Sequence, residues 1–579
     1  MQKEGERAMR ARRGRDDAGT ALVTTLIAMT VMVSLSLVML DRALGSQASS
    51  RENQDFKAAL AAAEAGVDDY VHRLNDSNGS YYVYTTASPD PANYAMGPVT
   101  GPWRWAPVPQ TRAADAQRGS FHYDVDTSTY TGTGSVAANG TIVIRSTGKV
   151  GSQRRTIKAV LRRSGFLDDM YFTNYETKDW SIYSTAADGH DSTWAQNNCA
   201  GRYWDTRGGT GGRNSGCSQI QFSSDTLDGP VHSNDAILIC DSVTFTKQVT
   251  TGYTASATTS NKAYRTTNCS APYTNTYPPS GTTFTPTANN PKTVAVVPMP
   301  ATNASLRAFT DVTASPRGCL YVGPTKILIK GANIKVTSPW TKPASLPAGC
   351  SLGVYFPIPA AGVVYVDDVP SDGTSDPNSW GVTETGKPVC PGSGNNVGYP
   401  VTTESGWTYP CRLGDVFVEE ESGSSSNALN GRLTIGSAND LYVTNNLDDL
   451  NGTSGTSMLG LIADGFIYYW HPVTAGGVNV TSGNGGSYPN RVAASMVSVA
   501  HSVTTQNYAI GASLGTLNLT GSLTQNYRGI VRSGTAGYAK AYHYDPRLAY
   551  DSPPHFLDPT VSTFSPVTLT ETTVDNHAG

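Results

Sequence analysis

The chain contains a long uninterrupted apolar run, Ala21–Leu40, with no charged residue, proline or glycine. As a helix, a run of about 20 residues crosses roughly 30 Å of lipid hydrocarbon. Cytoplasmic flanks are enriched in Lys and Arg, so the residues before the run predict an N-terminus inside the cell and export of everything after Leu40; they are Lys3, Arg7, Arg10, Arg12, Arg13 and Arg15. A cleaved secretory signal is the alternative, but its apolar region is only about 7–15 residues long and ends at a small-residue site.

The helix is expected to continue beyond the membrane. Residues 41–74 lack proline, and Leu60, Val67, Val71 and Leu74 recur at spacings of 7, 4 and 3, as on one buried helical face. This pattern predicts a single helix from Gly19 to Leu74, about 84 Å long at 1.5 Å per residue. Its first half would lie in lipid and its second half against a folded domain.

Four features of the N-terminal region occur together: a basic leader over residues 1–18, the pair Ala18-Gly19, the run TALVTTLIAM and the alanine-rich segment Ala61–Gly66. In this combination about residues 10–75 resemble the type IV pilin-like proteins, most closely the PilX-type minor pilins. The resemblance implies cleavage by a prepilin peptidase between Gly19 and Thr20, and assembly with other pilin-like subunits through the helix. Major pilins have Glu at the fifth mature position, where this chain has Thr24, so the resemblance favours a minor, low-copy subunit.

Residues 76–165 predict a linker followed by a small antiparallel sheet. The linker is rich in Tyr and Pro, and the segments FHYDVDTSTYTG, GTIVIRSTGKV and RRTIKAVLRR alternate apolar and polar residues. Alternation with period two is typical of half-buried strands. We expect this sheet to pack on the second half of the long helix, as the head of a pilin does.

Residues 166–560 predict a second kind of β structure. From about Leu227 onwards, short apolar triplets are separated by Asn, Asp or Gly, and Leu441 stands 21 residues before Ile462, as Met496 does before Leu517. A repeat of about twenty residues matches one coil of a parallel β-helix, in which each coil buries its inward residues against the next. An antiparallel β-sandwich of eight or more strands is the alternative.

Proline-rich and threonine-rich stretches complete this picture. Those between residues 270 and 430 are expected to be loops on one side of the coil. The stretch YHYDPRLAYDSPPHFLDP cannot continue a hydrogen-bonded ladder and is expected to cap the open end of the coil. Residues 561–579 are expected to be a frayed tail. The expected fold class is therefore mainly β, with a long N-terminal transmembrane helix, a small antiparallel sheet and a parallel β-helix.

All eight cysteines follow the apolar run, and no C-x-x-C pair occurs. An even number of cysteines in an exported domain indicates four disulfides, for which about 105 pairings exist. We expect neighbours to pair, because each neighbouring pair encloses a segment rich in Gly, Pro or Asn; the pairs are Cys199–Cys217, Cys240–Cys269, Cys319–Cys350 and Cys390–Cys411.

The sequence contains few motifs that indicate a catalytic or metal-binding site. Two Gly-x-Ser-x-Gly matches, 349–353 and 511–515, lack the strand-to-helix context of a nucleophile elbow. Turns explain the acid and histidine groups, and an Asn/Asp set able to bind Ca²⁺, as well as function does; these residues are Asp188, His190, Asp191, His232, Asp235, Trp470, His471, Asn445, Asn446, Asp448, Asp449 and Asn451. A net charge of -4 offers no basic field for nucleic acid. We expect no catalytic residue, no metal and no cofactor.

These features predict a non-enzymatic structural protein of the bacterial cytoplasmic membrane. It would be a minor pilin-like subunit of a type IV pilus or related fibre, with a single pass, its N-terminus inside and a large β-rich head outside. The expected partners are other pilin-like subunits, the membrane, a prepilin peptidase and a surface glycan or host ligand. The alternatives are a membrane-tethered β-helix enzyme acting on surface polysaccharide and a membrane-anchored adhesin.

Overall fold

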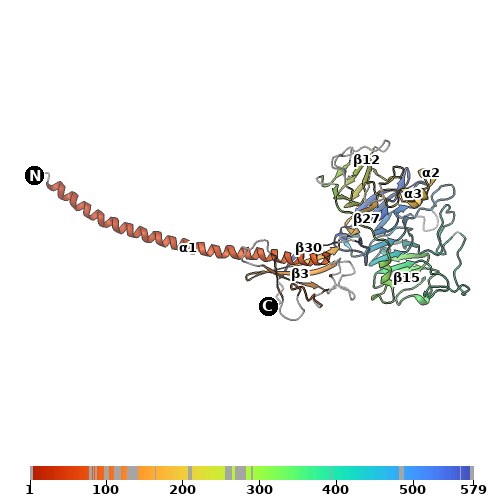
Figure 1. The fold of residues 1–579 in the computed structure, drawn as a ribbon, viewed down its shortest axis with the longest axis horizontal. Coiled ribbons are helices and arrows are strands. Elements are labelled where there is room, and N and C mark those ends of the chain that lie inside the picture. Colours follow the sequence, from red (N-terminus) through yellow and green to blue (C-terminus); the bar gives the residue numbers. More distant parts are fainter. Residues whose placement is uncertain are drawn as a thin grey trace.

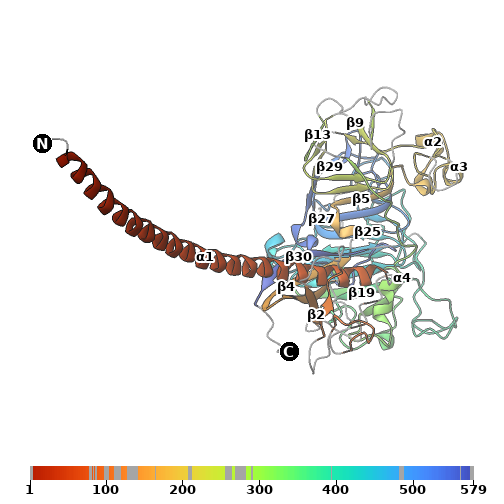
Figure 2. The ribbon, with the colours of Figure 1, turned by 60° about the vertical axis from the view of Figure 1, so that its left-hand side comes forward.

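The computed structural model shows one long helix, α1 (Glu4–Asp76), joined to a β-rich body (Figure 1). The first half of α1 stands free as a curved rod, with the N-terminus at its far end (Figure 2). The structure describes residues 4–76, 81, 84, 88–96, 104–109, 119–126, 141–163, 165–205, 212–223, 225–240, 242–253, 264–267, 282–287, 291–392, 394–480, 488–560 and 563–573.

α1 is continuous, as expected, but begins at Glu4 rather than at Gly19. The leader is rich in Glu, Arg and Ala, which are good helix formers, so the helix extends into it. The second half packs on a sheet: Val67, Tyr70 and Leu74 are almost fully buried there. Leu60 and Val71, expected on the same face, lie half-buried at its margin.

The sheet under α1 is antiparallel and has the strand order β1-β2-β3-β4-β30. Its strands are β1 (Ala106–Pro107), β2 (Ser120–Asp126), β3 (Thr141–Val150), β4 (Gln153–Arg163) and β30 (Phe564–Thr572). We call this sheet and the second half of α1 the anchor domain. Its core is one apolar cluster between helix and sheet, which agrees with the expected small sheet.

Strand β30 corrects the expectation that residues 561–579 form a frayed tail. Residues Phe564–Thr572 pair with β4, with a register irregularity between Pro566 and Thr568. The backbone N–H of Phe564 donates to Asn75 Oδ1 (2.6 Å), and Asn75 Nδ2 donates to the Phe564 carbonyl (3.0 Å). A threonine-rich sequence has high β propensity, and here the exposed edge of β4 gives it a partner.

Helix and sheet approach most closely at Gly148 of β3. A Cβ atom there would stand 2.1 Å from the Ala59 carbonyl oxygen and 2.3 Å from the Ala63 nitrogen. Backbone atoms of the helix cannot move aside without shifting the whole element. The close approach therefore requires glycine at position 148 of β3, and the alanines at 59, 62 and 63 of α1 keep the facing side of the helix small.

We expect Gly148→Ala to lower the stability of the anchor domain by about 1–3 kcal/mol, the usual cost of overpacking a core. The measurement is thermal unfolding of the full chain in detergent. Gly45→Ala is the matched control, because nothing lies within 4 Å of a Cβ at that position of α1. Helix propensity makes the control neutral or stabilising by up to about 1 kcal/mol. Equal melting temperatures for both variants would refute the close approach.

Because β4 and β30 are neighbours in one sheet, the chain between them is inserted into the anchor domain. We call the inserted residues 166–560 the head. The head also holds the short helices α2 (Thr185–Asp188), α3 (Ser192–Asn198) and α4 (Ala304–Arg307). Apart from short 3-10 helices, its other described elements are strands. These strands pair in parallel, except for three antiparallel pairings that involve β16, β17, β18, β28 and β29.

The main ladder runs in the order β13-β10-β7-β29-β27-β25-β23-β21-β19-β15, and a second ladder runs β18-β17-β16-β20-β22-β24-β26. The main ladder contains β13 (Thr283–Phe284), β10 (Thr244–Phe245), β7 (Thr226–Asp228), β29 (Ala536–Tyr544), β27 (Ser513–Tyr527), β25 (Arg491–Ser498), β23 (Met458–Ala463), β21 (Arg432–Ser437), β19 (Val363–Asp367) and β15 (Cys319–Val322). The second contains β18 (Tyr355–Pro357), β17 (Asn333–Thr337), β16 (Thr325–Lys330), β20 (Val416–Glu420), β22 (Leu441–Val443), β24 (Ile467–Tyr469) and β26 (Val503–Thr505).

Smaller strands extend these ladders. β5 (Tyr171–Tyr175), β8 (Val231–Ser233), β11 (Val249–Thr251), β14 (Lys292–Thr293) and β28 (Arg532–Ser533) attach to the main ladder, and β12 (Tyr264–Thr267), β9 (Ile237–Cys240) and β6 (Phe222–Ser223) form a third sheet. One apolar core is shared by strands of all three sheets.

The repeat along the head is longer than the sequence suggested. Leu441 aligns with Ile467, 26 positions later, and Met496 aligns with Leu523, 27 positions later. The expected alignment of Leu441 with Ile462 is wrong, since Ile462 belongs to β23 of the other ladder. From β19 to β27 the chain alternates between the two ladders, so apolar triplets recur there more often than aligned positions do.

The stretch YHYDPRLAYDSPPHFLDP does not cap an end of the coil, as had been expected. Its first three residues, 542–544, end strand β29 and pair within the main ladder. The rest crosses the side of the ladder: Arg432 binds Asp551 (2.7 Å), and Pro553 and Phe556 pack against Gly460 of β23. Proline cannot join a ladder as a donor, but this backbone runs across the strands and needs no ladder bonds. From there the chain returns to the anchor domain.

Three disulfides fasten loops of the head: Cys199–Cys217, Cys319–Cys350 and Cys390–Cys411. They are three of the four neighbour pairings expected from the sequence. Cys240 is also disulfide-bonded, but its expected partner, Cys269, lies outside the described residues.

Candidate functional site

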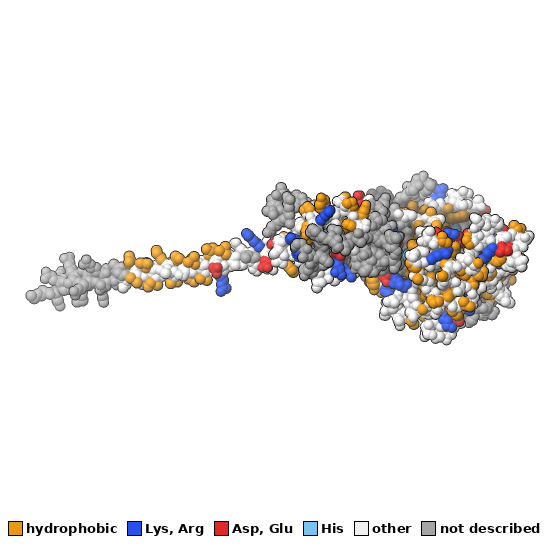
Figure 3. Space-filling view, turned by 90° about the horizontal axis from the view of Figure 1, so that it is seen from below, with side chains coloured by type: hydrophobic (Ala, Val, Ile, Leu, Met, Phe, Trp, Pro, Cys, Tyr) orange, Lys and Arg blue, Asp and Glu red, His pale blue; other side chains and the backbone are white. Residues whose placement is uncertain are grey.

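The largest exposed apolar surface belongs to the first half of α1. Every described residue of Thr20–Gln47 is exposed, and Figure 3 shows hydrophobic side chains along the visible face of this part of the helix. The exposed large apolar residues include runs of consecutive positions and therefore occupy all sides of the helix; they are Leu22, Val23, Leu26, Ile27, Met29, Val31, Met32, Val33, Leu35, Leu37, Val38, Met39, Leu40 and Leu44. Within the described residues, Thr20–Asp76 is the helix long and apolar enough to cross a membrane, with a mean hydropathy of 2.2 in its most apolar window.

The hydroxyl groups on this surface are satisfied within the helix. Thr24 Oγ1 donates to the Thr20 carbonyl (2.9 Å), and Thr30 Oγ1 donates to that of Leu26 (2.7 Å). Thr25, Ser34 and Ser36 make equivalent bonds to the carbonyl four residues earlier. Such bonds remove the need for water around a hydroxyl and often bend a helix slightly, in keeping with the curvature of α1. The surface can therefore enter an apolar environment without stranding a polar group.

The expected cleavage position between Gly19 and Thr20 lies inside α1, one residue before the apolar run. Thr20 is exposed, whereas the side chains of the basic leader lie outside what is described. Thr24 is exposed and carries no charge, so the first helical turns after Gly19 present no carboxylate.

The acid and histidine group at 188–191 is structural. Asp188 binds Lys178 Nζ (2.8 Å) and accepts from Ser218 Oγ (2.9 Å), and its pKa lies below its ordinary value despite burial because these donors stabilise the carboxylate. Asp191 caps α3 by accepting from the Trp194 N–H (2.8 Å). His190 stacks on Trp194. These side chains fasten a small helical subdomain.

The two buried histidines chosen from the sequence are also held by structural contacts. His232 hydrogen-bonds Thr250 Oγ1 (2.8 Å) and Asn234 Oδ1 (2.9 Å), and burial lowers its pKa. His471 hydrogen-bonds the Gln506 carbonyl (3.0 Å) and Asn479 Oδ1 (3.0 Å), and burial lowers its pKa too. Both rings use both nitrogens, so neither is poised for proton transfer.

Asp235 and Trp470 likewise serve the interior. Asp235 forms a fully buried ion pair with Arg213 (2.5 Å). Trp470 Nε1 donates to Tyr409 Oη (3.1 Å) in a buried aromatic cluster.

The first Gly-x-Ser-x-Gly match lies in an irregular loop, and the second lies at the start of strand β27. In the second Gly-x-Ser-x-Gly match, Ser513 Oγ accepts from the Gly515 N–H (3.2 Å), and in the first, Gly349 and Gly353 have φ values of +89° and +73°. Neither serine has a histidine partner among the described contacts. A nucleophile elbow is therefore absent from both places within the described residues.

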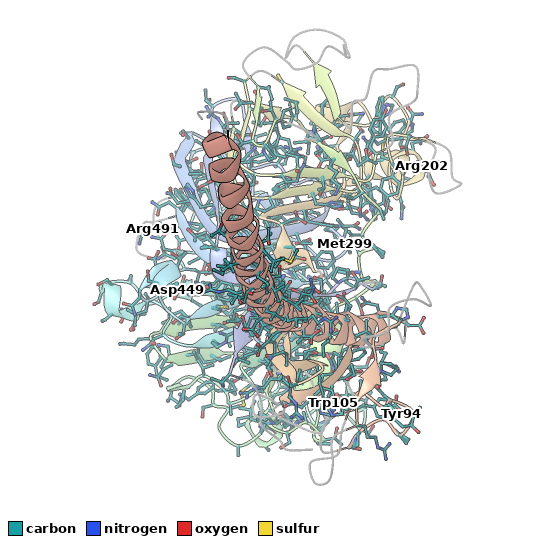
Figure 4. All side chains as sticks on the ribbon, turned by 90° about the vertical axis from the view of Figure 1, so that its left-hand side faces the viewer. Tyr94, Trp105, Arg202, Met299, Asp449 and Arg491 are labelled. Atoms are coloured by element: carbon teal, nitrogen blue, oxygen red, sulfur yellow. A yellow bond between two sulfur atoms is a disulfide. The ribbon has the colours of Figure 1, made fainter. Side chains whose placement is uncertain are left out.

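The Asn/Asp set at 445–451 does not form a calcium site in the described residues. Asp448 pairs with Arg491 (2.7 Å), and Asp449 pairs with Arg547 (2.7 Å). Figure 4 shows Asp449 and Arg491 on the same side of the head. Asn446 Oδ1 accepts from the Arg491 N–H (3.0 Å). No group of three or more His, Cys, Asp or Glu side chains in the described residues could hold a metal ion.

One charged pair gave no signal in the sequence. His501 Nδ1 lies 2.9 Å from Asp179 Oδ2, and Asp179 is completely buried. Burial alone would lower the pKa of His501, but the hydrogen bond and charge of Asp179 raise it above its ordinary value. The two residues are 322 positions apart in the sequence. Asp179 follows β5 and His501 follows β25, and these strands come close because both pair with β27.

Two aspartates have raised pKa values; both lie where the chain passes from the main ladder to the second ladder. Burial raises the pKa of Asp440 and of Asp464 from 3.8 to about 6. Between these values the folded head holds protons that the unfolded chain has lost, so these acids make stability fall as pH rises from about 4 to about 6. At neutral pH both carry a partly desolvated charge.

We therefore expect Asp464→Asn to raise the melting temperature at pH 7 and to leave it unchanged below pH 4. The asparagine oxygen can still accept from the Asn303 N–H, which now donates to Asp464 Oδ1 (2.6 Å). The measurement is the difference between variant and parent melting temperatures across pH 4–7, which cancels the other titrating groups. A difference that does not grow with pH would contradict the raised pKa.

Comparison with known proteins gives few matches. No protein-family model matches the sequence, and no curated protein matches it. Among solved structures, the chain aligns with the competence-associated pilin ComZ from Thermus thermophilus at 14% identity and a TM-score of 0.26, over 90% of this chain and 97% of that one.

Proposed function

We propose that this protein is a minor pilin-like subunit that joins a type IV pilus or a related fibre through α1 and presents the head outside the cell. The observation that carries the proposal is the division of α1. Its first half is apolar on every side and has its hydroxyl groups satisfied, and its second half is fixed to the anchor domain. Such a helix suits transfer from lipid to the core of a helical fibre.

In this proposal the head is a parallel β-helix. Support comes from the register of the main ladder, where Ile435, Leu461, Met496 and Leu523 align in succession and are all buried. On the face of the second ladder that points away from the shared core, Phe417, Tyr442 and Tyr468 stack with centroid distances of 4.8 and 5.1 Å. Stacks of like residues in successive coils are expected where each coil buries the next.

The proposed role is assembly and presentation rather than catalysis, with low copy number. Thr24 supplies no carboxylate for the amine of a neighbouring subunit, and a head of this size, attached at the side of the anchor domain (Figure 1), is difficult to repeat along a closely spaced fibre. Prepilin peptidase would cut between Gly19 and Thr20, and the N-terminus would face the cytoplasm.

The test is the composition and accessibility of fibres from the native cell. We expect sheared fibres to contain this protein in small amounts beside a major subunit, and protease added to intact spheroplasts to digest the head. Fibres built chiefly of this protein would overturn the low-copy assignment. Retention in the membrane with no fibre association would favour a tethered adhesin or a tethered enzyme on surface polysaccharide.

A further inference from the structure

The first and last parts of the head meet at a seam in the main ladder. β29, near the end of the head, pairs with β7, near its beginning, and Tyr542 aligns with Leu227. Two positions earlier along each segment, Lys540 of β29 stands beside Asp225, the residue before β7, with Nζ 2.9 Å from Oδ2. These residues are 315 positions apart, so their contact closes the head upon itself.

The surroundings of this contact are apolar and contain a second buried ion pair. The Asp225 side chain is 9% exposed and that of Lys540 20% exposed. The guanidinium of Arg528 lies 3.6 Å from the centre of the Phe222 ring and pairs with Glu176 (2.5 Å), and both charged side chains are at most 2% exposed. Lys540 Nζ lies 6.0 Å from the centre of the same ring, so it shares these largely buried surroundings with another cation.

This environment differs from that of the other buried lysine–aspartate pair. Lys178 and Asp188 lie equally close (2.8 Å), but Asp188 also accepts from Ser184 and Ser218, and the pKa of Lys178 is raised although burial opposes this. For Lys540, burial lowers the pKa, and Arg528 acts in the same direction against the attraction of Asp225. A desolvated lysine beside another cation is a typical activated nucleophile.

We propose that Lys540 and Asp225 join through an intramolecular amide bond between Nζ and Cγ, which staples the seam of the head. The site is independent of the proposed function, since it requires only the folded head. A lysine nucleophile, a carboxyl group in contact with it and a further buried carboxylate close by are the groups that such self-condensation needs.

The reaction balances without an external reactant. A proton passes from the Lys540 ammonium to the Asp225 carboxylate, and the freed lone pair on Nζ attacks Cγ. The tetrahedral intermediate loses its hydroxyl group together with a proton from nitrogen, so one C–N bond forms, one C–O bond breaks and one water molecule leaves. No atom changes oxidation state.

Glu176 is the group assigned to carry the proton from nitrogen to the leaving hydroxyl. Its side chain is 1% exposed, and its Oε1 accepts no hydrogen bond from any described residue. Its partner Arg528 and the ammonium of Lys540 both lie over the Phe222 ring, 3.6 and 6.0 Å from the ring centre, so Glu176 belongs to the same cluster as Lys540. Oε2 is held by Arg528, so the free oxygen can take and return a proton while the side chain stays in place.

Peptide mapping of the full-length protein by mass spectrometry, after reduction and alkylation, tests the proposal. We expect one branched peptide that joins the segments around Asp225 and Lys540 and is one water lighter than their sum. Lys540→Arg should abolish it, whereas Lys178→Arg, the matched control, should leave it intact. Glu176→Gln should reduce its yield in molecules that retain the native fold by circular dichroism.

Recovery of both peptides as separate linear fragments from the folded wild-type protein would overturn the proposal, whatever the variants do. A branched peptide that persists in Lys540→Arg would assign the linkage to another lysine and would overturn it equally.

Discussion

Replacing Phe564 with alanine is expected to destabilise the anchor domain by about 3–5 kcal/mol, the usual cost of truncating a buried phenylalanine. The side chain is 2% exposed and belongs to the apolar cluster between α1 and the sheet. The backbone of the same residue makes two hydrogen bonds with Asn75 at the end of α1. Phe564 therefore joins the last strand to both the helix and the core.

The measurement is amide hydrogen exchange in β3 and β4 of the full chain in detergent. Exchange should accelerate in both strands of Phe564→Ala. Leu569→Ala is the matched control, since Leu569 lies in the same strand with 54% of its surface exposed, and such surface changes usually stay within about 0.5 kcal/mol. Unchanged protection in β4 of Phe564→Ala would mean that β30 adds little to the anchor domain.

Val31→Asp is expected to abolish stable membrane retention and fibre incorporation. Val31 lies in the middle of the apolar run and is 51% exposed. An acidic residue at the centre of a membrane helix costs about 2.5–3.5 kcal/mol on insertion scales. The same charge would also face apolar neighbours in a fibre core, where the run Ala21–Leu40 offers no cation to pair with it.

Membrane fractionation and the content of sheared fibres measure this effect. Val31→Thr is the control, because its hydroxyl can donate to the carbonyl four residues earlier, as that of Thr30 does. We expect Val31→Thr to behave as the wild type in both assays. Normal incorporation of Val31→Asp would contradict the role of α1 as a buried assembly element.

The sequence was most informative where structure is local. Val67 and Leu74 mark the buried face of α1 by their spacing alone, and strands β3 and β4 follow directly from alternation. Tyr70 was not predicted to lie on this face although it is fully buried, because its hydroxyl obscures an otherwise apolar ring. The sequence shows that this part of α1 is rich in alanine, but it does not show that these alanines contact Gly148 of β3.

Long-range pairing was inaccessible to such reasoning. Nothing in a threonine-rich C-terminus indicates that Phe564 returns to a helix ending at Asp76. The apolar pattern predicts a repeat of about twenty residues, whereas aligned positions lie 26 and 27 residues apart. Strands of both ladders carry the same apolar pattern, so only the backbone register shows which strands pair. Of the polar clusters, those close in sequence proved to be caps and turns, while the pair Asp179–His501 was hidden by its separation.

The position of β30 has a consequence for biosynthesis. Domains generally fold in order of emergence, from the N-terminus, but here the strand that completes the anchor domain is made after the whole head. Until Phe564 has emerged, β4 keeps an open edge, and a chain terminated prematurely keeps it permanently. Open strand edges invite aggregation and attack by proteases. A shortened product would thus expose this strand edge, and only a chain translated through β30 could complete the anchor domain.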